Sequence, residues 1–267
     1  MDMLRLDKIH PVISGNKWFK LKYHLENFRK GGFNGLLTFG GAWSNHIVAT
    51  ACASFHKKIP SVGIIRGERP SVLSPSLKQA MNFEMKLDFI PRELYKQKDS
   101  DDFIKNLKNK YPGFYMIPEG GAGEEGEKGA GEIMNLINKD VYTHIACAIG
   151  TATMFKGIAK TVSANQQVLG VVVLKGWKKI NKEHGVTIFD DYHFGGYARY
   201  TPQLIESMND FYKQTRIPTD FVYTGKLVYA VMDLINKNFF PENSKILLIH
   251  SGGLQGNTSL PDGSLIF

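Results

Sequence analysis

The chain has 267 residues, of which 43% are hydrophobic and 22% charged, so it can bury a sizeable core and is not disordered. Its 27 glycines and 11 prolines form no repeat, which excludes collagen-like and low-complexity architectures. The net charge of +8 is compatible with anionic ligands. We interpret the densest basic run, 175–182, as a solvated loop and helix start, and expect no nucleic-acid partner.

Cysteine content and hydropathy exclude several further classes. The two cysteines, Cys52 and Cys147, lie far apart without metal-ligand spacing, so we expect neither a disulfide scaffold nor a metal site, and a reducing cytosol fits. The N-terminus lacks the apolar stretch of a signal peptide. Apolar runs such as 169–174 have strand length, well below the roughly 18 residues of a membrane span. We therefore expect a cytoplasmic protein without a membrane partner.

Short apolar runs alternate with longer amphipathic ones, which indicates βαβ units and parallel sheets. In chain order, we expect a helix at 16–30, a strand at 35–40, a helix at 44–57, a strand at 60–66, a helix at 74–85, a strand at 86–90, a helix at 101–110 and a strand at 114–117. Strand and helix patterns resume at 143–149, 153–164, 168–174, 202–212, 225–236 and 245–250.

The glycine-rich stretch 118–131 divides these two series of elements. We interpret it as a domain junction, with a mobile active-site loop as the alternative. The helix at 16–30 precedes the first clear strand, so we expect the N-terminal segment to pack on the second half of the chain. The prediction is a small α/β domain of residues 33–119 and a large α/β domain of residues 1–32 plus 120–267.

Three segments place reactive or ligand-binding groups at predicted helix starts. Lys17 follows a Gly-Asn pair, and the positive end of the helix dipole disfavours its ammonium form; the alternative is that Lys17, Lys20 and Lys22 are exposed helix lysines. Ser44 either caps its helix or, together with Asn45, grips a carboxylate or cofactor oxygen. The third segment offers hydroxyls and backbone N–H groups suited to a phosphate, from Gly150, Thr151, Ala152 and Thr153.

Further candidates lie late in the chain. Tyr197 and Tyr223 each stand beside glycines, and Ser251 follows the strand predicted at 245–250. Packing roles for the aromatic residues and a plain turn at Ser251 are the alternatives. Nucleotide binding is unsupported, because the chain lacks the full G-x-G-x-x-G pattern and the Gly-Lys-Ser/Thr of a P-loop.

The ordered set of these strings is more specific than any one of them. Gly-Asn-Lys, Trp-Ser-Asn-His, Gly-Thr-Ala-Thr, Gly-Gly-Tyr, Val-Tyr-Thr-Gly-Lys and His-Ser-Gly-Gly follow one another along nearly the whole chain. This set resembles the pyridoxal-phosphate enzymes that include 1-aminocyclopropane-1-carboxylate deaminase and D-cysteine desulfhydrase. The resemblance implies the tryptophan synthase β-like fold (fold type II), with two open parallel-sheet α/β domains, pyridoxal 5′-phosphate between them, and a homodimer.

The resemblance also implies roles for individual residues. Lys17 would form the Schiff base with the cofactor aldehyde, and Asn45 would hold the 3′-oxygen of the cofactor ring. Ser44 would contact the carboxylate of a small amino-acid substrate, and Ser251 or Thr224 would hydrogen-bond the pyridine nitrogen. The remaining implied site residues are the phosphate-binding Gly150, Thr151, Ala152 and Thr153 and the catalytic Tyr197 and Tyr223.

Two positions bear on the branch of the family. The deaminase branch carries glutamate in its Val-Tyr-Glu-Gly-Lys string, where this chain has Thr224. A hydroxyl partner leaves the pyridine nitrogen neutral, which suits β-elimination of a good leaving group better than opening of a cyclopropane ring. We therefore expect a D-cysteine desulfhydrase-like lyase, with a cyclopropane deaminase as one alternative. A second alternative is a catalytically weak family member that binds cofactor or amino acid. It is favoured by Trp43, which replaces the family's usual glutamine, and by the bulky Met154–Phe155 region.

Overall fold

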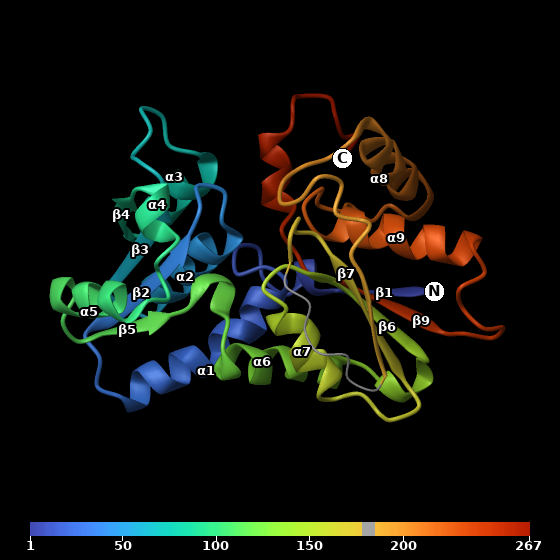
Figure 1. The fold of residues 1–267 in the computed structure, drawn as a ribbon, viewed down its shortest axis with the longest axis horizontal. Helices are drawn as coiled ribbons and strands as arrows, with labels where there is room; N and C mark the ends of the chain where they lie inside the picture. Colours follow the sequence, from blue (N-terminus) through green and yellow to red (C-terminus); the bar gives the residue numbers. More distant parts are fainter. Residues whose placement is uncertain (178–184) are drawn as a thin grey trace. The chain divides into compact units, whose positions relative to one another are not determined.

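The computed structural model describes residues 1–177 and 185–267 (Figure 1). They form two compact units, one of Met1–Phe19 with Glu127–Phe267 and the other of Lys20–Gly126. The domain boundaries expected from sequence, 33–119 and 1–32 plus 120–267, stay a prediction. Residues 178–182 of the basic run lie outside the described residues. Within the described ranges, no helix combines the length and apolar character needed to cross a membrane.

The unit of Lys20–Gly126 is built on a parallel four-stranded sheet in the order β4-β3-β2-β5. Ile47 and Leu77 pack in the cluster on one face, and Phe103 and Leu107 in the cluster on the other, so helices cover both faces. Its strands are β2 (Gly35–Gly40), β3 (Ser61–Arg66), β4 (Lys86–Ile90) and β5 (Phe114–Ile117), and its helices are α2 (Asn45–His56), α3 (Pro75–Asn82), α4 (Arg92–Tyr95) and α5 (Asp101–Lys110).

The unit that contains the C-terminus has a parallel five-stranded sheet in the order β1-β9-β6-β7-β8. Alternate residues of β6 point to opposite faces, because side chains alternate along a strand. Ile145 packs with Phe155 of α7, whereas Ala146 packs with Leu227 of α9. The strands are β1 (Asp2–Arg5), β6 (His144–Ile149), β7 (Gln167–Val172), β8 (Val186–Phe189) and β9 (Ile246–His250), and the helices include α7 (Thr153–Ala159), α8 (Pro202–Thr215) and α9 (Thr224–Asn236).

Most predicted elements are present, and the differences have local causes. The strands β1 and β8 were not predicted, since each has only four residues and mixed polarity. Helix α1 (Asn16–Lys30) matches its predicted bounds and extends from one compact unit into the other. The helix predicted at 153–164 ends at Ala159.

The glycine-rich stretch 118–131 contains a helix, α6 (Glu124–Gly131), that its composition argued against. The reason is a close approach between α6 and α7. A Cβ added to Gly157 would lie 2.3 Å from the Glu127 carbonyl oxygen, and one added to Gly131 would lie 3.0 Å from Thr161. The Lys160 ammonium also pairs with the Glu127 carboxylate at 2.6 Å. Packing between the two helices therefore overrides the low helix propensity of glycine here.

Candidate active site

Lys17 lies in the first turn of α1 as a half-buried side chain. Burial lowers the pKa of its amino group from 10.5 to about 8. The amino group donates a hydrogen bond to the Asn16 side-chain oxygen at 3.0 Å. The interpretation of the neighbouring lysines as exposed is wrong for Lys20, which is 3% exposed and reaches the Gly120 carbonyl, whereas Lys22 is exposed.

The segment that carries Lys17 is packed against the turn after β9. The Asn16 backbone N–H donates to the Ser251 carbonyl at 3.1 Å. Gly15 has φ +67°, and a Cβ at this position would lie 1.8 Å from the same carbonyl oxygen. Gly252, with φ +81°, would likewise bring a Cβ within 2.8 Å of the Gly15 Cα. Because neither glycine has a side chain, the backbone just before Lys17 can lie against the Ser251 turn.

The loop Gly150 to Thr153 follows β6 and leads into α7. Ala152 adopts φ +62°, a left-handed conformation that is strained for a residue with a Cβ. The Thr151 and Thr153 hydroxyls lie 2.9 Å apart. The next residue, Met154, accepts a hydrogen bond from the Asn16 side-chain amide at 3.5 Å, so this loop and the Lys17 segment meet at the carboxyl ends of β6 and β9. That edge is where open parallel sheets bind ligands.

The two candidate tyrosines lie beside this loop. A Cβ added to Gly150 would approach Tyr223 Cε1 to 3.2 Å, which places the Tyr223 ring over the glycine. The Tyr197 and Tyr223 rings meet edge to face with centroids 6.3 Å apart. Tyr197 is 42% exposed, and Tyr223 is half-buried. The structure therefore brings Lys17, the 150–153 loop, Ser251 and both tyrosines into one region of a single unit.

The carboxylate of Asp220 organises the start of the helix that follows Tyr223. It accepts hydrogen bonds from the N–H groups of Val222 at 3.1 Å, Tyr223 at 2.8 Å and Thr224 at 2.9 Å. Burial raises the pKa of Asp220, whereas the N–H donors of Thr224 and Tyr223 favour its ionised form. The side chain of Thr224 is fully buried next to this carboxylate.

Ser44 and Asn45 belong to the other compact unit. The predicted capping role of Ser44 is confirmed, because its hydroxyl oxygen accepts the Ile47 N–H of α2 at 3.3 Å. The buried side-chain oxygen of Asn45 has no hydrogen-bond partner within residues 1–177 and 185–267. Their contacts with cofactor and substrate stay a prediction.

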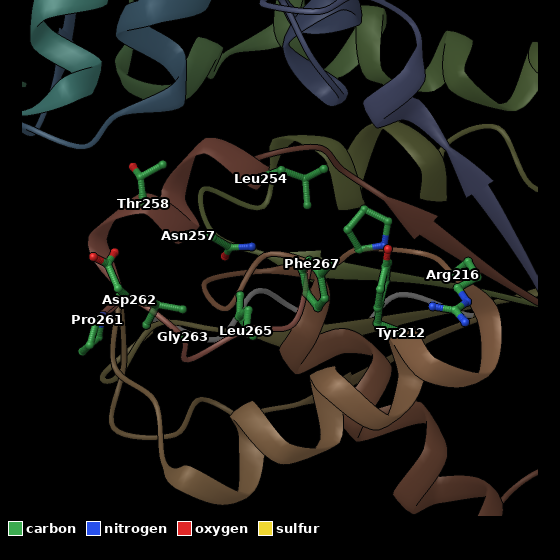
Figure 2. A pocket seen from close by; sticks show the side chains of 12 residues that line it. Tyr212, Arg216, Leu254, Asn257, Thr258, Pro261, Asp262, Gly263, Leu265 and Phe267 are labelled. Atoms are coloured by element: carbon green, nitrogen blue, oxygen red, sulfur yellow. The ribbon is translucent and has the colours of Figure 1, made fainter.

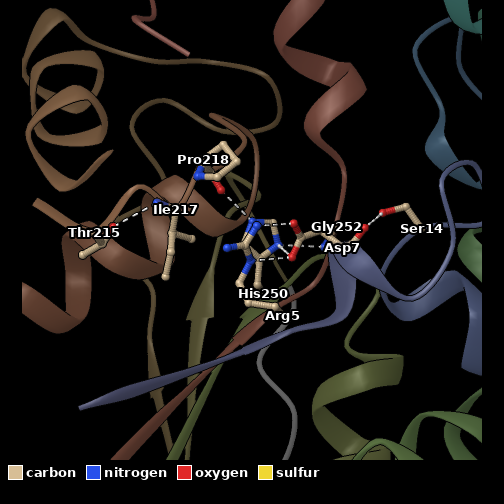
Figure 3. Close-up of polar contacts among 8 residues, drawn as sticks. All are labelled: Arg5, Asp7, Ser14, Thr215, Ile217, Pro218, His250 and Gly252. Carbon is tan, nitrogen blue, oxygen red and sulfur yellow. Dashed lines mark hydrogen bonds and ion pairs between the residues drawn. The ribbon is translucent and has the colours of Figure 1, made fainter. Parts of the chain in front are cut away.

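A buried polar network surrounds His250, the residue before Ser251 (Figure 3). His250 Nε2 donates to the Pro218 carbonyl at 2.8 Å, and its Nδ1 accepts the Gly252 N–H at 3.2 Å. A carbonyl oxygen only accepts, so Nε2 carries a proton in this contact. Asp7 lies 3.5 Å from Nδ1 and is held by Arg5 at 2.8 and 2.6 Å. His250 is thus a structural support, in line with the packing role expected for it.

A cavity of about 670 Å³ lies elsewhere in the same unit (Figure 2). Tyr212, Arg216, Asn257 and Phe267 are among the residues that line it, and none of the predicted site residues does. Both polar ends of the Asn257 amide are engaged, by the Phe221 N–H and the Thr219 carbonyl. Over the described ranges, no cluster of three metal-binding side chains occurs.

Sequence reasoning did not assign roles to Lys226 and Asp220. Lys226 was noted only as the end of the Val-Tyr-Thr-Gly-Lys string, yet it is fully buried. Asp220 lies five residues before the helix predicted at 225–236, too far to be read as its N-cap, and no other signal in the sequence marks it. No pattern in the sequence marks Lys226 as buried, because its burial depends on a loop about 30 residues away.

Comparison with known proteins places the chain among named relatives. No protein-family model matches it. It is 27% identical over 271 residues to a Pyrococcus abyssi protein provisionally named 1-aminocyclopropane-1-carboxylate deaminase, covering 91% of this chain and 81% of that one. It is 23% identical to the D-cysteine desulfhydrase of Klebsiella pneumoniae, covering 94% and 86%.

A solved structure described as an ACC deaminase homologue aligns with a TM-score of 0.81 at 23% identity, covering 96% of this chain and 85% of that one. Together with the two parallel sheets, this likeness confirms the predicted fold class. The resemblance drawn from the sequence motifs is confirmed by the names of the relatives.

Proposed function

We propose that this chain, a homologue of 1-aminocyclopropane-1-carboxylate deaminases and D-cysteine desulfhydrases, is a pyridoxal-phosphate-dependent lyase of the desulfhydrase type. It would convert a small amino acid such as D-cysteine, together with water, into pyruvate, ammonia and hydrogen sulfide. The observation that carries the proposal is the desolvated Lys17 amino group, on a helix start whose Asn16 N–H bonds the Ser251 carbonyl beside the 150–153 loop.

The residues present fit the cofactor. An amine adds to an aldehyde only in its neutral form, and the lowered pKa of Lys17 supplies that form near neutral pH. The small residues and hydroxyls of Gly150–Thr153 suit a phosphate group. The buried side-chain oxygen of Asn45, at the start of α2, accepts no hydrogen bond from the described protein residues, so it is available to a ligand. Pyridoxal phosphate, when bound, supplies the electron sink that stabilises negative charge at the substrate Cα.

The remaining steps belong to this chain's side chains. Lys17 Nζ anchors the cofactor and then serves as the base that removes the proton from the substrate Cα. Ser44 binds the substrate carboxylate, and Tyr223 or Ser44 moves protons in the later steps. Tyr197, whose ring packs against Tyr223, orders that side of the site.

The preference for elimination over ring opening rests on the pyridine nitrogen. Both candidate partners, Ser251 and Thr224, are hydroxyls, which hydrogen-bond a neutral nitrogen and do not stabilise a full positive charge. The carboxylate that precedes this string, Asp220, is already engaged by three backbone N–H groups. A weaker electron sink suits loss of sulfide, a good leaving group, better than cleavage of a cyclopropane carbon–carbon bond.

The alternative of a weak member that only binds cofactor or amino acid rested partly on the bulk of Met154 and Phe155. These side chains are 3% and 1% exposed and pack in the hydrophobic core of their unit. Their bulk is therefore used in packing, which favours the enzyme. A homodimer and a cytoplasmic location are proposals that rest on the resemblance.

The substrate assignment is tested by product analysis. The holoenzyme is incubated separately with D-cysteine, β-chloro-D-alanine and 1-aminocyclopropane-1-carboxylate, and pyruvate is assayed against 2-oxobutyrate. We expect pyruvate from the first two compounds and little 2-oxobutyrate from the third. Efficient 2-oxobutyrate formation without pyruvate would overturn the choice of branch. Spectral changes with the amino acids but no keto acid would instead support the binding-only alternative.

The pH dependence of cofactor capture tests the state of Lys17. With a pKa of about 8 rather than 10.5, its neutral fraction at pH 7 is roughly 300-fold larger than that of an ordinary lysine. We expect the rate at which the cofactor-free chain takes up pyridoxal phosphate to rise about tenfold per pH unit below pH 7.5 and to level off above the pKa of Lys17. Propylamine, measured in parallel, corrects for ionisation of the cofactor. If the rate of cofactor uptake keeps rising up to pH 10, as the rate of the propylamine reaction does, the lowered pKa assigned to Lys17 is wrong.

A further inference from the structure

Lys226 is a fully buried lysine that the proposed chemistry does not use. It lies in the first turn of α9, three residues after Tyr223. A buried amine is costly unless its donors are satisfied, so the partners of Lys226 indicate what it does in the fold. They are two backbone carbonyls, those of His193 and Gly196, each 2.8 Å from Nζ.

Those carbonyls belong to the loop that carries Tyr197, and this loop is strained. Phe194 and Ala198 have φ of +51° and +53°, and the two glycines between His193 and Tyr197 have φ of +92° and +114°. Positive φ at residues with a Cβ persists only where surrounding contacts hold it. Gly196 N–H bonds to the His193 carbonyl at 2.9 Å, and Lys226 binds the same carbonyl, so Lys226 holds both ends of this tight turn.

The segment that leads into Lys226 also fixes the backbone at Tyr223. The Asp220 carboxylate accepts the Tyr223 and Thr224 N–H groups. Burial lowers the pKa of Lys226 to about 8, and the negative charge of Asp220 opposes this in part. Asp220 and Lys226 are both fully buried. Lys226, three residues after Tyr223, thus joins the segment of Tyr223 to the loop of Tyr197, and the two rings lie 6.3 Å apart.

We propose that Lys226 is a positioning residue that holds the strained 193–198 loop through two carbonyls and so fixes Tyr197 against Tyr223 at the active site. The link to catalysis rests on the proposed function, in which both tyrosines border the substrate. The link between Lys226 and the loop rests on the contacts alone.

The first test measures the loop directly. Lys226→Met keeps the length and apolar stem of the side chain and removes its donors. In the holoenzyme, we expect hydrogen exchange at the Gly196 and Arg199 N–H groups to accelerate at least tenfold. Lys237→Met, an exposed lysine just beyond the same helix, is the matched control and should leave these rates within twofold. Unchanged loop exchange in Lys226→Met would overturn the proposal.

Removal of the Lys226 charge also takes away a favourable electrostatic interaction of the buried Asp220 carboxylate, so Asp220→Asn/Lys226→Met is made as a second variant. It removes both charges and still lacks the donors to the loop. Accelerated exchange at Gly196 and Arg199 is again expected. If hydrogen exchange at these two N–H groups is as slow in the double variant as in the wild type, the single variant acted through an unbalanced charge and not through the lost loop contacts. That result would overturn the proposal.

A kinetic cycle distinguishes positioning from general stability. With D-cysteine as probe, Lys226→Met is expected to lower kcat at least tenfold in the wild-type background but less than threefold in the Tyr197→Phe background, because the effect passes through Tyr197. Equal losses in both backgrounds would show that Lys226 does not act through this tyrosine. If the wild type turns over none of the amino acids tested, the proposed function fails, while loop exchange still decides the role of Lys226.

Discussion

Lys17→Ala is expected to abolish both covalent attachment of pyridoxal phosphate and turnover. The amino group is the only part of Lys17 assigned to chemistry, as cofactor anchor and as base at the substrate Cα. Loss of a positioned base alone typically costs about 10²- to 10⁴-fold in rate, and loss of the anchor adds to this. We therefore expect turnover to fall by at least about 10³-fold. Borohydride treatment of the wild type should fix the cofactor on Lys17, as identified by peptide mass spectrometry.

Lys22→Ala is the matched control for this prediction. Lys22 lies on the same helix but is exposed, with its ammonium over the Tyr23 ring. It should keep visible absorption of the bound cofactor and near-normal turnover. A borohydride-stable adduct in Lys17→Ala that matches the wild-type yield would show that another lysine carries the cofactor.

Gly15→Ala is expected to destabilise the fold more than any other single methyl addition considered for this site. At φ +67° an alanine is strained, and its Cβ would lie 1.8 Å from the Ser251 carbonyl oxygen. Left-handed strain and forced displacement of packed backbone each cost about 1–3 kcal/mol. We expect the free energy of unfolding to fall by about 3 kcal/mol, measured by chemical denaturation. Cofactor uptake should also slow, since the Asn16–Ser251 hydrogen bond would break.

Gly32→Ala is the control that separates left-handed backbone strain from the clash with packed backbone. Gly32 has φ +64°, nearly the same backbone conformation, but a Cβ there meets nothing within 4 Å. It should therefore show the cost of the left-handed backbone alone, about 1–2 kcal/mol. Equal destabilisation by the two substitutions would mean that the contact with Ser251 does not set the position of Lys17.

Local sequence patterns predicted most regular elements because their signals are local. The strand β2 (Gly35–Gly40) and the helices α1 and α5 match their expected bounds. Ser44 caps α2 as its position before the helix indicated. The ordered motifs likewise pointed to the relatives that the comparisons name, since each motif is a short string that can be read without knowledge of the fold.

Pairing and packing across long sequence separations could not be predicted in this way. The strand β1 exists because its four residues pair with β9 near the opposite end of the chain. The helix α6 forms among glycines because α7 approaches its backbone. In both cases the stabilising partner lies far along the chain, and no window of local sequence contains it.

For the candidate site, too, some features follow from local sequence and others from the tertiary structure. The sequence by itself determined which residues are proposed to carry the chemistry, because Lys17, the Gly150–Thr153 loop and Ser251 each stand in a recognisable string. Only the tertiary structure decided how they are held. The backbone contact between Gly15 and Ser251 and the burial of Lys226 under the Tyr197 loop depend on atoms that meet only in the fold. A buried charge and a contact between backbones leave no periodicity in a sequence, since both are properties of the neighbours that folding supplies.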